Sequence, residues 1–243
     1  MRHLGGLDGA AAVGAWTTAG EHSKRGAFQA APSDLIHSRR DRIGTHMART
    51  TGSNGERTAA LVRDAGIRLI WEHGFEAMSL RRLAAEVGIQ PGSLYNHFET
   101  KQALLFDIVR DHMETLLAAC DAALAGHEAP RDRLIAFAGF HLRYHMTRRM
   151  LVYIANSELR SLEPDNRAAI VSLRKRYEQK LTDILVAGRE RGLFQVDDPR
   201  VTTFVIIWML TGICEWYQPN GRMSEDELVA LHVDMVLGAV QAR

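Results

Sequence analysis

Apolar residues recur every three or four positions from Arg57 to the end of the chain. This spacing places them along one face of an α-helix, and no alternating run of β-branched residues is long enough to predict a sheet. Glycines, prolines and capping residues divide the pattern into three short helices before about residue 100 and longer helices after it. The sequence therefore predicts an all-α protein of roughly nine helices.

The first 54 residues lack this periodicity. They are rich in small and basic residues, so we expect residues 1–54 to form a disordered tail. The alternative is a basic arm that touches DNA phosphates. Asp8 and several glycines interrupt the apolar stretch Leu4–Trp16, which argues against a secretory signal. Met47 lies just before the helical pattern and is an alternative to Met1 as the start of translation.

Composition narrows the class of protein further. The chain has no uncharged stretch of the roughly 18 residues that a membrane-spanning helix requires. Its two cysteines, Cys120 and Cys214, have neither the number for a disulfide framework nor the spacing for a metal site. These features predict a cytoplasmic protein without a membrane span. The net charge of +1 averages a basic tail, a neutral region over 55–105 and a slightly acidic remainder, so it does not exclude a DNA partner.

The segment Gly74–Lys101 carries the signals of two short helices joined by a tight turn. Ser79 is placed to cap the first helix, Gly88 to end it in the left-handed conformation, and Pro91 to open the second. The second helix is apolar on one side and small and polar on the other. Together these signals predict a helix-turn-helix, whose second helix fits the major groove of DNA.

The same segment resembles the DNA-binding domain of the TetR family of bacterial transcriptional regulators. The preceding segment Arg57–His73 corresponds to the first helix of that domain. At Gln90-Pro91 the chain departs from the family, which more often has a small hydroxyl residue followed by a variable one, and this departure concerns base preference. The residues that match the family are Gly74, Ser79, Leu83, Ala84, Val87, Gly88, Ile89, Gly92, Leu94, Tyr95, His97, Phe98, Lys101 and Leu104.

The resemblance implies a role for each polar residue around the second helix, with an ordinary solvated side chain as the alternative in every case. Phosphate contacts fix the position of such a helix, and contacts to base edges read the sequence. Gly92 is expected to permit close approach to DNA. The expected phosphate contacts are Ser79, Arg81, Tyr95, His97 and Lys101, and the candidates for base contact are Gln90, Ser93 and Asn96.

The resemblance also implies the domain organisation. A helix-turn-helix DNA-binding domain is expected over 55–105, followed by a helical bundle for effector binding and dimerisation over 106–243. Aromatic and polar residues fall on three predicted helices of this bundle. They predict an apolar cavity with a few polar groups, although plain core packing is the alternative. The candidate ligand-binding residues are Phe137, Phe140, His141, Tyr144, Arg174, Tyr177 and Trp208.

Three stretches of the bundle are similar to one branch of the family, namely Asn156–Pro164, Arg174–Tyr177 and Trp216-Tyr217. That branch regulates fatty-acid, steroid and aromatic-acid catabolism and senses acyl-coenzyme A thioesters. The resemblance therefore implies such a thioester as the candidate effector. An acyl chain requires an apolar tunnel, and the phosphates of coenzyme A require Arg and Lys at its mouth. A solvated helix face is the alternative for the basic run.

His141 and His145 stand four residues apart, so both can face one metal ion. The glutamate of the metalloprotease motif is missing beside His141. We predict neither a metal nor a cofactor, and a structural metal or metal effector is the alternative. No nucleophile–base pair or catalytic carboxylate pair stands at recognisable spacing, so the sequence does not predict an enzyme. A helical enzyme or lipid-binding module that uses the cavity is the alternative function.

Pairing is expected through the last two helices. The segment Thr203–Tyr217 is almost wholly apolar, which indicates burial on both sides. The final helix has an apolar stripe formed by Leu228, Leu231, His232, Met235, Val236 and Ala239. The resemblance implies a four-helix interface in a homodimer, with a monomer core as the alternative. The sequence thus predicts a ligand-released repressor that binds a palindromic double-stranded DNA operator.

Overall fold

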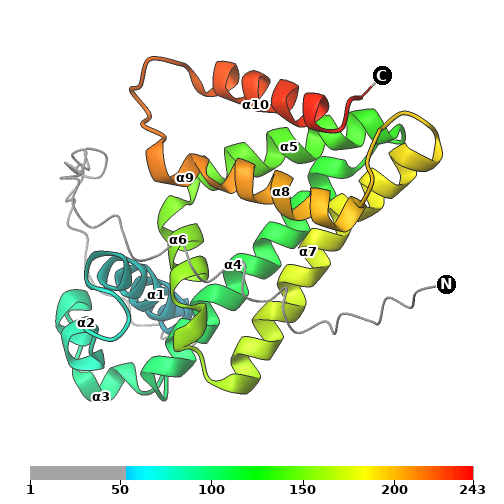
Figure 1. The fold of residues 1–243 in the computed structure, drawn as a ribbon. Helices are drawn as coiled ribbons and strands as arrows, with labels where there is room; N and C mark the ends of the chain where they lie inside the picture. Colours follow the sequence, from blue (N-terminus) through cyan, green and yellow to red (C-terminus); the bar gives the residue numbers. More distant parts are fainter. Residues whose placement is uncertain (1–52, 243) are drawn as a thin grey trace.

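The computed structural model describes residues 53–242 (Figure 1). Met47 and all but the last two residues of the predicted tail lie outside the described residues. Within the described part the chain forms ten α-helices, one short 3₁₀ helix and no strand, which confirms the all-α prediction. The helices are α1 (Ser53–His73), α2 (Leu80–Val87), α3 (Pro91–Leu94), α4 (Lys101–Leu124), α5 (Pro130–Thr147), α6 (Arg149–Ser157), η2 (Leu159–Ser161), α7 (Pro164–Glu190), α8 (Pro199–Thr211), α9 (Ile213–Trp216) and α10 (Glu225–Ala239).

Two breaks between these helices differ from the prediction. Helix α5 ends at Arg148, where φ is −125° and ψ is 33°, although no glycine or proline marks the position. Gly212 divides the predicted helix Thr203–Tyr217 into α8 and α9. In addition, α1 begins at Ser53, before the expected Arg57. The breaks depend on how the helices pack, so local sequence signals do not reveal them.

The predicted caps of the helix-turn-helix are confirmed. The Ser79 hydroxyl accepts a hydrogen bond from the backbone N–H of Arg82 at 3.2 Å, which begins α2. Gly88 ends α2 with φ of 74°, a conformation that glycine adopts without a side-chain clash. Pro91 opens α3, and the inward-facing Leu94 of that helix is fully buried. Local signals therefore position α3 on the surface of the small N-terminal bundle.

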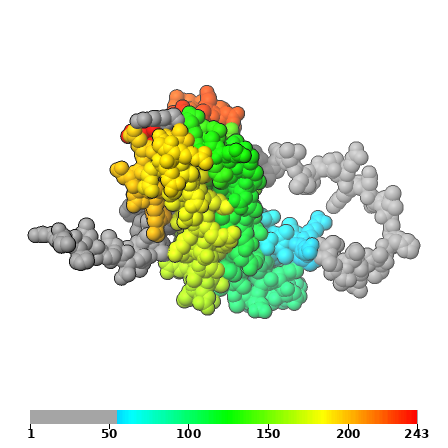
Figure 2. Space-filling model, turned by 90° about the vertical axis from the view of Figure 1, so that its right-hand side faces the viewer, coloured from blue at the N-terminus to red at the C-terminus, as the bar shows by residue number. Residues whose placement is uncertain are grey.

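Helix α4 joins this N-terminal bundle to the rest of the molecule without an interruption. It contacts α1 near its beginning and packs against α5, α6 and α7 farther along. Figures 1 and 2 show α1–α3 and α10 at opposite ends of the molecule. The domain boundary that we placed between residues 105 and 106 falls inside α4, so the division stays a prediction about two regions that share one helix.

The second bundle is organised around α5. Helices α4, α7, α8 and α10 each pack against it, and α7 also packs against α8. Leu134, Phe137 and Leu142 of α5 are fully buried in this core. In the part of the chain that the structure describes, no helix is both long and apolar enough to cross a membrane.

Candidate DNA-binding face and effector cavity

Helix α3 presents a polar surface to solvent. Gln90, Ser93, Tyr95 and Asn96 are exposed, and the side chain of Tyr95 is 55% exposed. A Cβ atom added to Gly92 would meet nothing within 4 Å, so the fold itself does not require a glycine there. The structure thus exposes the predicted base-reading residues on and beside one short helix: Ser93 is within α3, Gln90 is its N-cap, and Asn96 follows its C-terminal cap.

The predicted phosphate contacts are less uniform. Ser79 and Arg81 are exposed at the start of α2, and His97 is half-buried. Lys101 folds back onto the turn between α1 and α2, where its ammonium donates to the carbonyls of Phe75 at 2.9 Å and Glu76 at 3.2 Å. The same ammonium lies 4.3 Å from the centre of the Phe75 ring. Two of its three N–H donors therefore already hold the turn, which leaves one for a phosphate.

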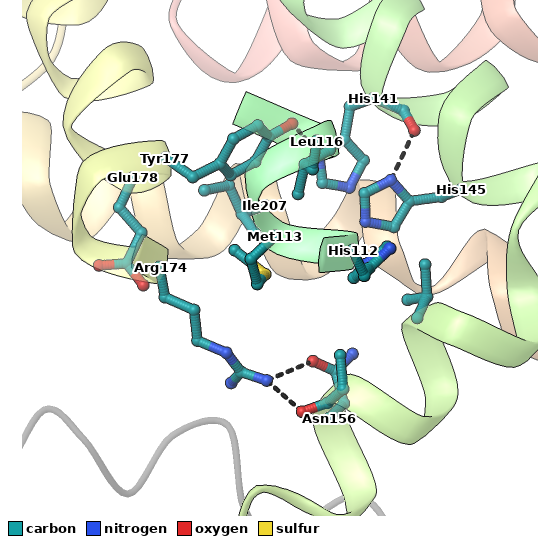
Figure 3. A pocket seen from close by; sticks show the side chains of 12 residues that line it. His112, Met113, Leu116, His141, His145, Asn156, Arg174, Tyr177, Glu178 and Ile207 are labelled. Atoms are coloured by element: carbon teal, nitrogen blue, oxygen red, sulfur yellow. Dashed lines mark hydrogen bonds between the residues drawn. The ribbon is translucent and has the colours of Figure 1, made fainter. Parts of the chain in front are cut away.

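A cavity lies in the second bundle between α4, α5, α6, α7 and α8 (Figure 3). The cavity has a volume of about 30 Å³. One water needs roughly 10–15 Å³, so a ligand larger than a few waters must widen the cavity. The lining residues are His112, Met113, Leu116, His141, His145, Val152, Ala155, Asn156, Arg174, Tyr177, Glu178 and Ile207.

Three of the seven predicted ligand residues line this cavity, namely His141, Arg174 and Tyr177. The other four lie around it. Phe137 is fully buried and packs with its ring centre 5.3 Å from that of Tyr177. The Tyr144 hydroxyl donates to the backbone carbonyl of His112 at 3.4 Å. Phe140 packs against Tyr144, and Trp208 is half-buried on α8.

Most of the lining residues were not predicted from sequence. Helix α4 contributes His112, Met113 and Leu116, and α6 contributes Val152, Ala155 and Asn156. Both helices carry ordinary apolar faces, which look the same in sequence whether they line a cavity or fill a core. The sequence offered one sign that α4 lines a cavity, which is an isolated histidine on its apolar face. That residue is His112.

The histidines of the cavity form a stacked and bonded group. The rings of His141 and His145 are nearly parallel, with centres 3.7 Å apart. His141 Nδ1 is 3.0 Å from the Tyr177 hydroxyl, and its Nε2 is 3.1 Å from the Thr211 hydroxyl. Both nitrogens of His141 are therefore engaged, so the pair does not form the two-histidine metal site that its spacing allowed. Within the described residues, no cluster of three or more His, Cys, Asp or Glu side chains could hold a metal ion.

Burial keeps these histidines neutral. It lowers the pKa of His145 to about 4. It also lowers the pKa of His112 to about 3, with a smaller contribution from repulsion by His145. The pKa of His141 lies well below its ordinary value for the same reasons, burial first. At neutral pH the histidine end of the cavity is therefore an uncharged hydrogen-bonding surface.

Arg174 supplies a positive charge at the other end of the cavity. Its guanidinium donates to the Ala155 carbonyl and, at 3.2 Å, to the Asn156 side-chain oxygen, which ties α7 to the C-terminal part of α6. Burial lowers its pKa to about 10, so it stays protonated at neutral pH. The next two residues of the basic run, Lys175 and Arg176, are exposed.

Helix α6 connects the cavity to the DNA-binding region. Its Tyr153 ring meets the Trp71 ring of α1 edge to face, with centres 4.8 Å apart. At its C-terminal end, Glu158 accepts a hydrogen bond from the backbone N–H of Phe75 at 3.2 Å and another from the Ser161 hydroxyl at 2.8 Å. The helix that lines the cavity therefore also touches both α1 and the turn before α2.

An apolar surface remains exposed on the last three helices. The final helix divides its predicted stripe: Leu228, His232 and Val236 are buried, whereas Leu231, Met235 and Ala239 are exposed. Large apolar side chains are thus open to solvent on neighbouring helices, which is unusual for a monomer when they lie together. The exposed large apolar residues of these helices are Val201, Val205, Trp216, Leu231 and Met235.

Comparisons with known proteins agree with this architecture. Residues 62–108 match the family model of bacterial regulatory proteins of the tetR family, and residues 127–240 match that of the tetracyclin repressor-like C-terminal domain. The HTH-type transcriptional repressor KstR2 of Mycobacterium tuberculosis is 26% identical over 198 residues, which cover 80% of this chain and 98% of that protein.

Solved structures of similar proteins extend the match. A bacterial regulatory protein in the TetR family from Rhodococcus RHA1 superposes with a TM-score of 0.73 at 28% identity, covering 77% of this chain and 98% of the other. AibR in complex with isovaleryl coenzyme A and operator DNA gives a TM-score of 0.69 at 25% identity, covering 74% of this chain and 97% of the other. On its sequence, its helix-turn-helix and its second helical bundle, this chain belongs to the TetR family of bacterial transcriptional regulators.

Proposed function

We propose that the protein is a homodimeric transcriptional repressor that leaves its operator when a small molecule enters the cavity. The observation that carries the proposal is the double contact of α6, which lines the cavity through Val152, Ala155 and Asn156 and bonds to the DNA-binding region through Glu158. A ligand that moves α6 therefore acts on the position of α1 and α2.

Operator binding is assigned to the exposed face around α3. Gln90, Ser93 and Asn96 read base edges, because their amide and hydroxyl groups can pair with bases in the major groove. Tyr95 and the residues at the start of α2, Ser79 and Arg81, hold the helix against the phosphates. His97 and the remaining N–H of Lys101 complete the set, and Gly92 keeps the surface low enough for close approach.

The proposed effector is an acyl-coenzyme A thioester. AibR was solved with isovaleryl coenzyme A and operator DNA, and the cavity of this chain has an apolar wall together with the charge of Arg174. Because the cavity is too small for an acyl chain as it stands, binding must separate the helices around it. The thioester then binds the widened state better than the DNA-bound state, and that difference in affinity is what releases DNA.

Dimerisation is assigned to the exposed apolar surface of α8, α9 and α10, which would bury it against the same surface of a second copy. Two copies of α3 then face two half-sites of a palindromic operator. The relatives are transcription regulators, and we propose that this chain likewise works in the cytoplasm without catalysing a reaction.

A gel-shift assay on the DNA upstream of the gene, at several salt concentrations, tests the proposal. We expect binding that is sequence-specific and weakens with salt. Isovaleryl coenzyme A and longer saturated thioesters should then release the DNA, whereas free coenzyme A should not. If a folded dimer shows no specific binding, the regulator assignment is wrong. If it binds DNA but no thioester releases it, the effector class alone is wrong.

A further inference from the structure

One end of the cavity contains a histidine nitrogen that has no hydrogen-bond partner. The side chain of His112 is 4% exposed, and its Nδ1 is buried without a partner in the described part of the chain. Buried polar atoms are nearly always bonded, and an unbonded one costs free energy. The ring lines the cavity, but this nitrogen lies behind the cavity surface, so a group inside the cavity reaches it once the helices around the cavity separate.

A second imidazole fixes which kind of group this is. His145 Nδ1 lies 2.8 Å from the backbone carbonyl of His141. A carbonyl only accepts, so Nδ1 carries the hydrogen, and in the neutral ring Nε2 is left as an acceptor. Figure 3 shows this ring directed toward the space beside Met113 and His112. The wall therefore offers an acceptor from His145 beside an unpaired nitrogen of His112.

The rest of the inner wall gives a ligand little else to bond. Both nitrogens of His141 are already engaged by Tyr177 and Thr211. The other inner residues are apolar: Met113, Leu116, Val152 and Ile207. The polar contact available at this end is thus confined to His112 and His145.

The exposure of the lining residues shows how a ligand enters. Asn156 and Glu178 are half-buried, whereas the other lining residues are buried. The opening therefore lies beside Asn156, Glu178 and the guanidinium of Arg174, and in Figure 3 the rings of His141 and His145 lie farther from it than His112 does. A thioester whose coenzyme A stays at the opening brings the far end of its acyl group to His112 and His145.

We infer that the effector carries a hydroxyl group at the far end of its acyl chain. This inference rests on the proposed effector class and makes it more specific. The hydroxyl donates to His145 Nε2 and, in the widened cavity, accepts from His112 in the tautomer that carries its hydrogen on Nδ1, so one oxygen serves both rings. A saturated chain leaves both nitrogens unpaired in an apolar cavity. A ketone can accept from His112 but leaves the acceptor of His145 without a donor.

The test compares two matched series of thioesters on the intact protein. Saturated straight-chain acyl-coenzyme A thioesters of four to ten carbons are titrated calorimetrically, beside the same chains with a terminal hydroxyl. At the best-fitting length we expect the hydroxylated thioester to bind at least about ten-fold more tightly, since the unpaired buried groups penalise the saturated one. Equal affinity would mean that water satisfies the two nitrogens and would overturn the inference.

Variants test whether the tighter binding of the hydroxylated thioester depends on His112 and His145. His112→Leu and His145→Leu should each reduce the ratio of the two affinities toward one, mainly because the saturated thioester binds better. Met113→Leu changes the same wall without a polar atom, and the ratio should persist in it. If the ratio persists in both folded histidine variants, the inference is wrong. If a histidine variant does not fold, the ratio of the two thioester affinities measured on the wild-type protein still tests the inference.

The same data separate two kinds of failure. Saturated thioesters that bind and release DNA as well as hydroxylated ones refute the hydroxyl alone. If neither series binds a protein that still binds its operator, the thioester effector is refuted, and the hydroxyl inference is refuted with it.

Discussion

Tyr95 projects from α3 with 55% of its side chain exposed and no role in the core. We expect Tyr95→Ala to weaken binding to every operator sequence by a similar factor, roughly five- to ten-fold, because a phosphate contact carries no base information. The melting temperature should stay nearly unchanged, since exposed substitutions have small effects on stability. Gel shifts on operator and mutated operators measure the first effect, and thermal unfolding the second.

Tyr95→Phe is the matched control, because it keeps the ring and removes the hydroxyl. Affinity near that of the wild type would assign the contact to the ring, and affinity near that of the alanine variant would assign it to the hydroxyl. Unchanged affinity in Tyr95→Ala would show that the docking of α3 is wrong.

The buried histidines make stability depend on pH in a defined direction. Burial lowers the pKa of His112 to about 3 and that of His145 to about 4 from an ordinary 6.5. Below pH 6.5 these two histidines are therefore protonated in the unfolded chain but stay neutral in the folded chain. The free energy of unfolding consequently decreases as the pH falls toward 4. Each group contributes on the order of 1 kcal/mol per pH unit within that window.

Thermal unfolding of the wild type between pH 7 and pH 4.5 measures this dependence. His145→Leu should flatten the curve, whereas His127→Ala, at an exposed position, should leave its slope unchanged. A wild-type melting temperature that does not vary with pH over this range would contradict the burial of neutral imidazoles.

The sequence placed Gln90, Ser93 and Asn96 on an exposed surface, as the structure has them, and their contacts to bases stay a prediction. It predicted the residues that line the cavity only in part. The exposure of these residues could be predicted because caps at Ser79 and Gly88 fix the orientation of a short helix from local sequence alone. The position of Lys101 was not foreseen, because its partners are carbonyls 25 and 26 residues away. Carbonyl positions depend on the fold, and every residue type supplies one.

At the scale of elements, α6 is the helix on which both regions depend. Glu158→Ala removes its hydrogen bond to the Phe75 backbone. We expect operator affinity to change little, but the thioester concentration needed for half-release of DNA should increase several-fold, because coupling between the sites loses one of its contacts. Fluorescence anisotropy of labelled operator during a thioester titration measures this.

Glu163→Ala is the control for that experiment, since Glu163 is exposed in the same connection and its side chain does not cap α7. The control should behave as the wild type does. If Glu158→Ala releases DNA at the wild-type thioester concentration, α6 does not transmit the signal through this contact.

Sequence patterns gave the order and nature of most helices but not where α5 becomes α6. The break at Arg148 has no glycine or proline, and it matters because it turns α6 toward α1. For the same reason the contribution of α4 and α6 to the cavity was missed. A helical apolar face shows that residues turn inward, but which inward faces leave space between them depends on how five helices pack.

For the whole molecule, the decisive expectation is the dimer. Met235 on α10 is 48% exposed and Val205 on α8 is 59% exposed. Either residue changed to Glu should convert the dimer to a folded monomer, because a charge would be buried in an apolar interface. Operator affinity should then fall by roughly a hundred-fold or more. In the dimer, binding of one DNA-binding domain holds the second at a high effective concentration near its half-site, and a monomer lacks this advantage.

Light scattering after size exclusion gives the mass of each variant, and circular dichroism shows whether it folds. Leu61→Glu is the control for the mass measurement, since Leu61 is equally exposed but lies on α1 at the opposite end of the molecule. A dimer that survives both Met235→Glu and Val205→Glu would place the interface elsewhere.

Helix α4 has a mechanical consequence for DNA recognition. It is an uninterrupted helix of 24 residues, so at 1.5 Å per residue it is a rigid rod of about 36 Å. Its cavity-lining residue His112 is 11 residues from Lys101, about 16 Å along the helix. A pivot of about 10° at His112 therefore moves the DNA-binding end of α4 by about 3 Å, which is close to the 3.4 Å rise of one base step. A cavity that opens by only the width of an acyl chain can therefore shift each DNA-binding domain by about one base pair. Both domains of the dimer would then be out of position on their half-sites of the operator.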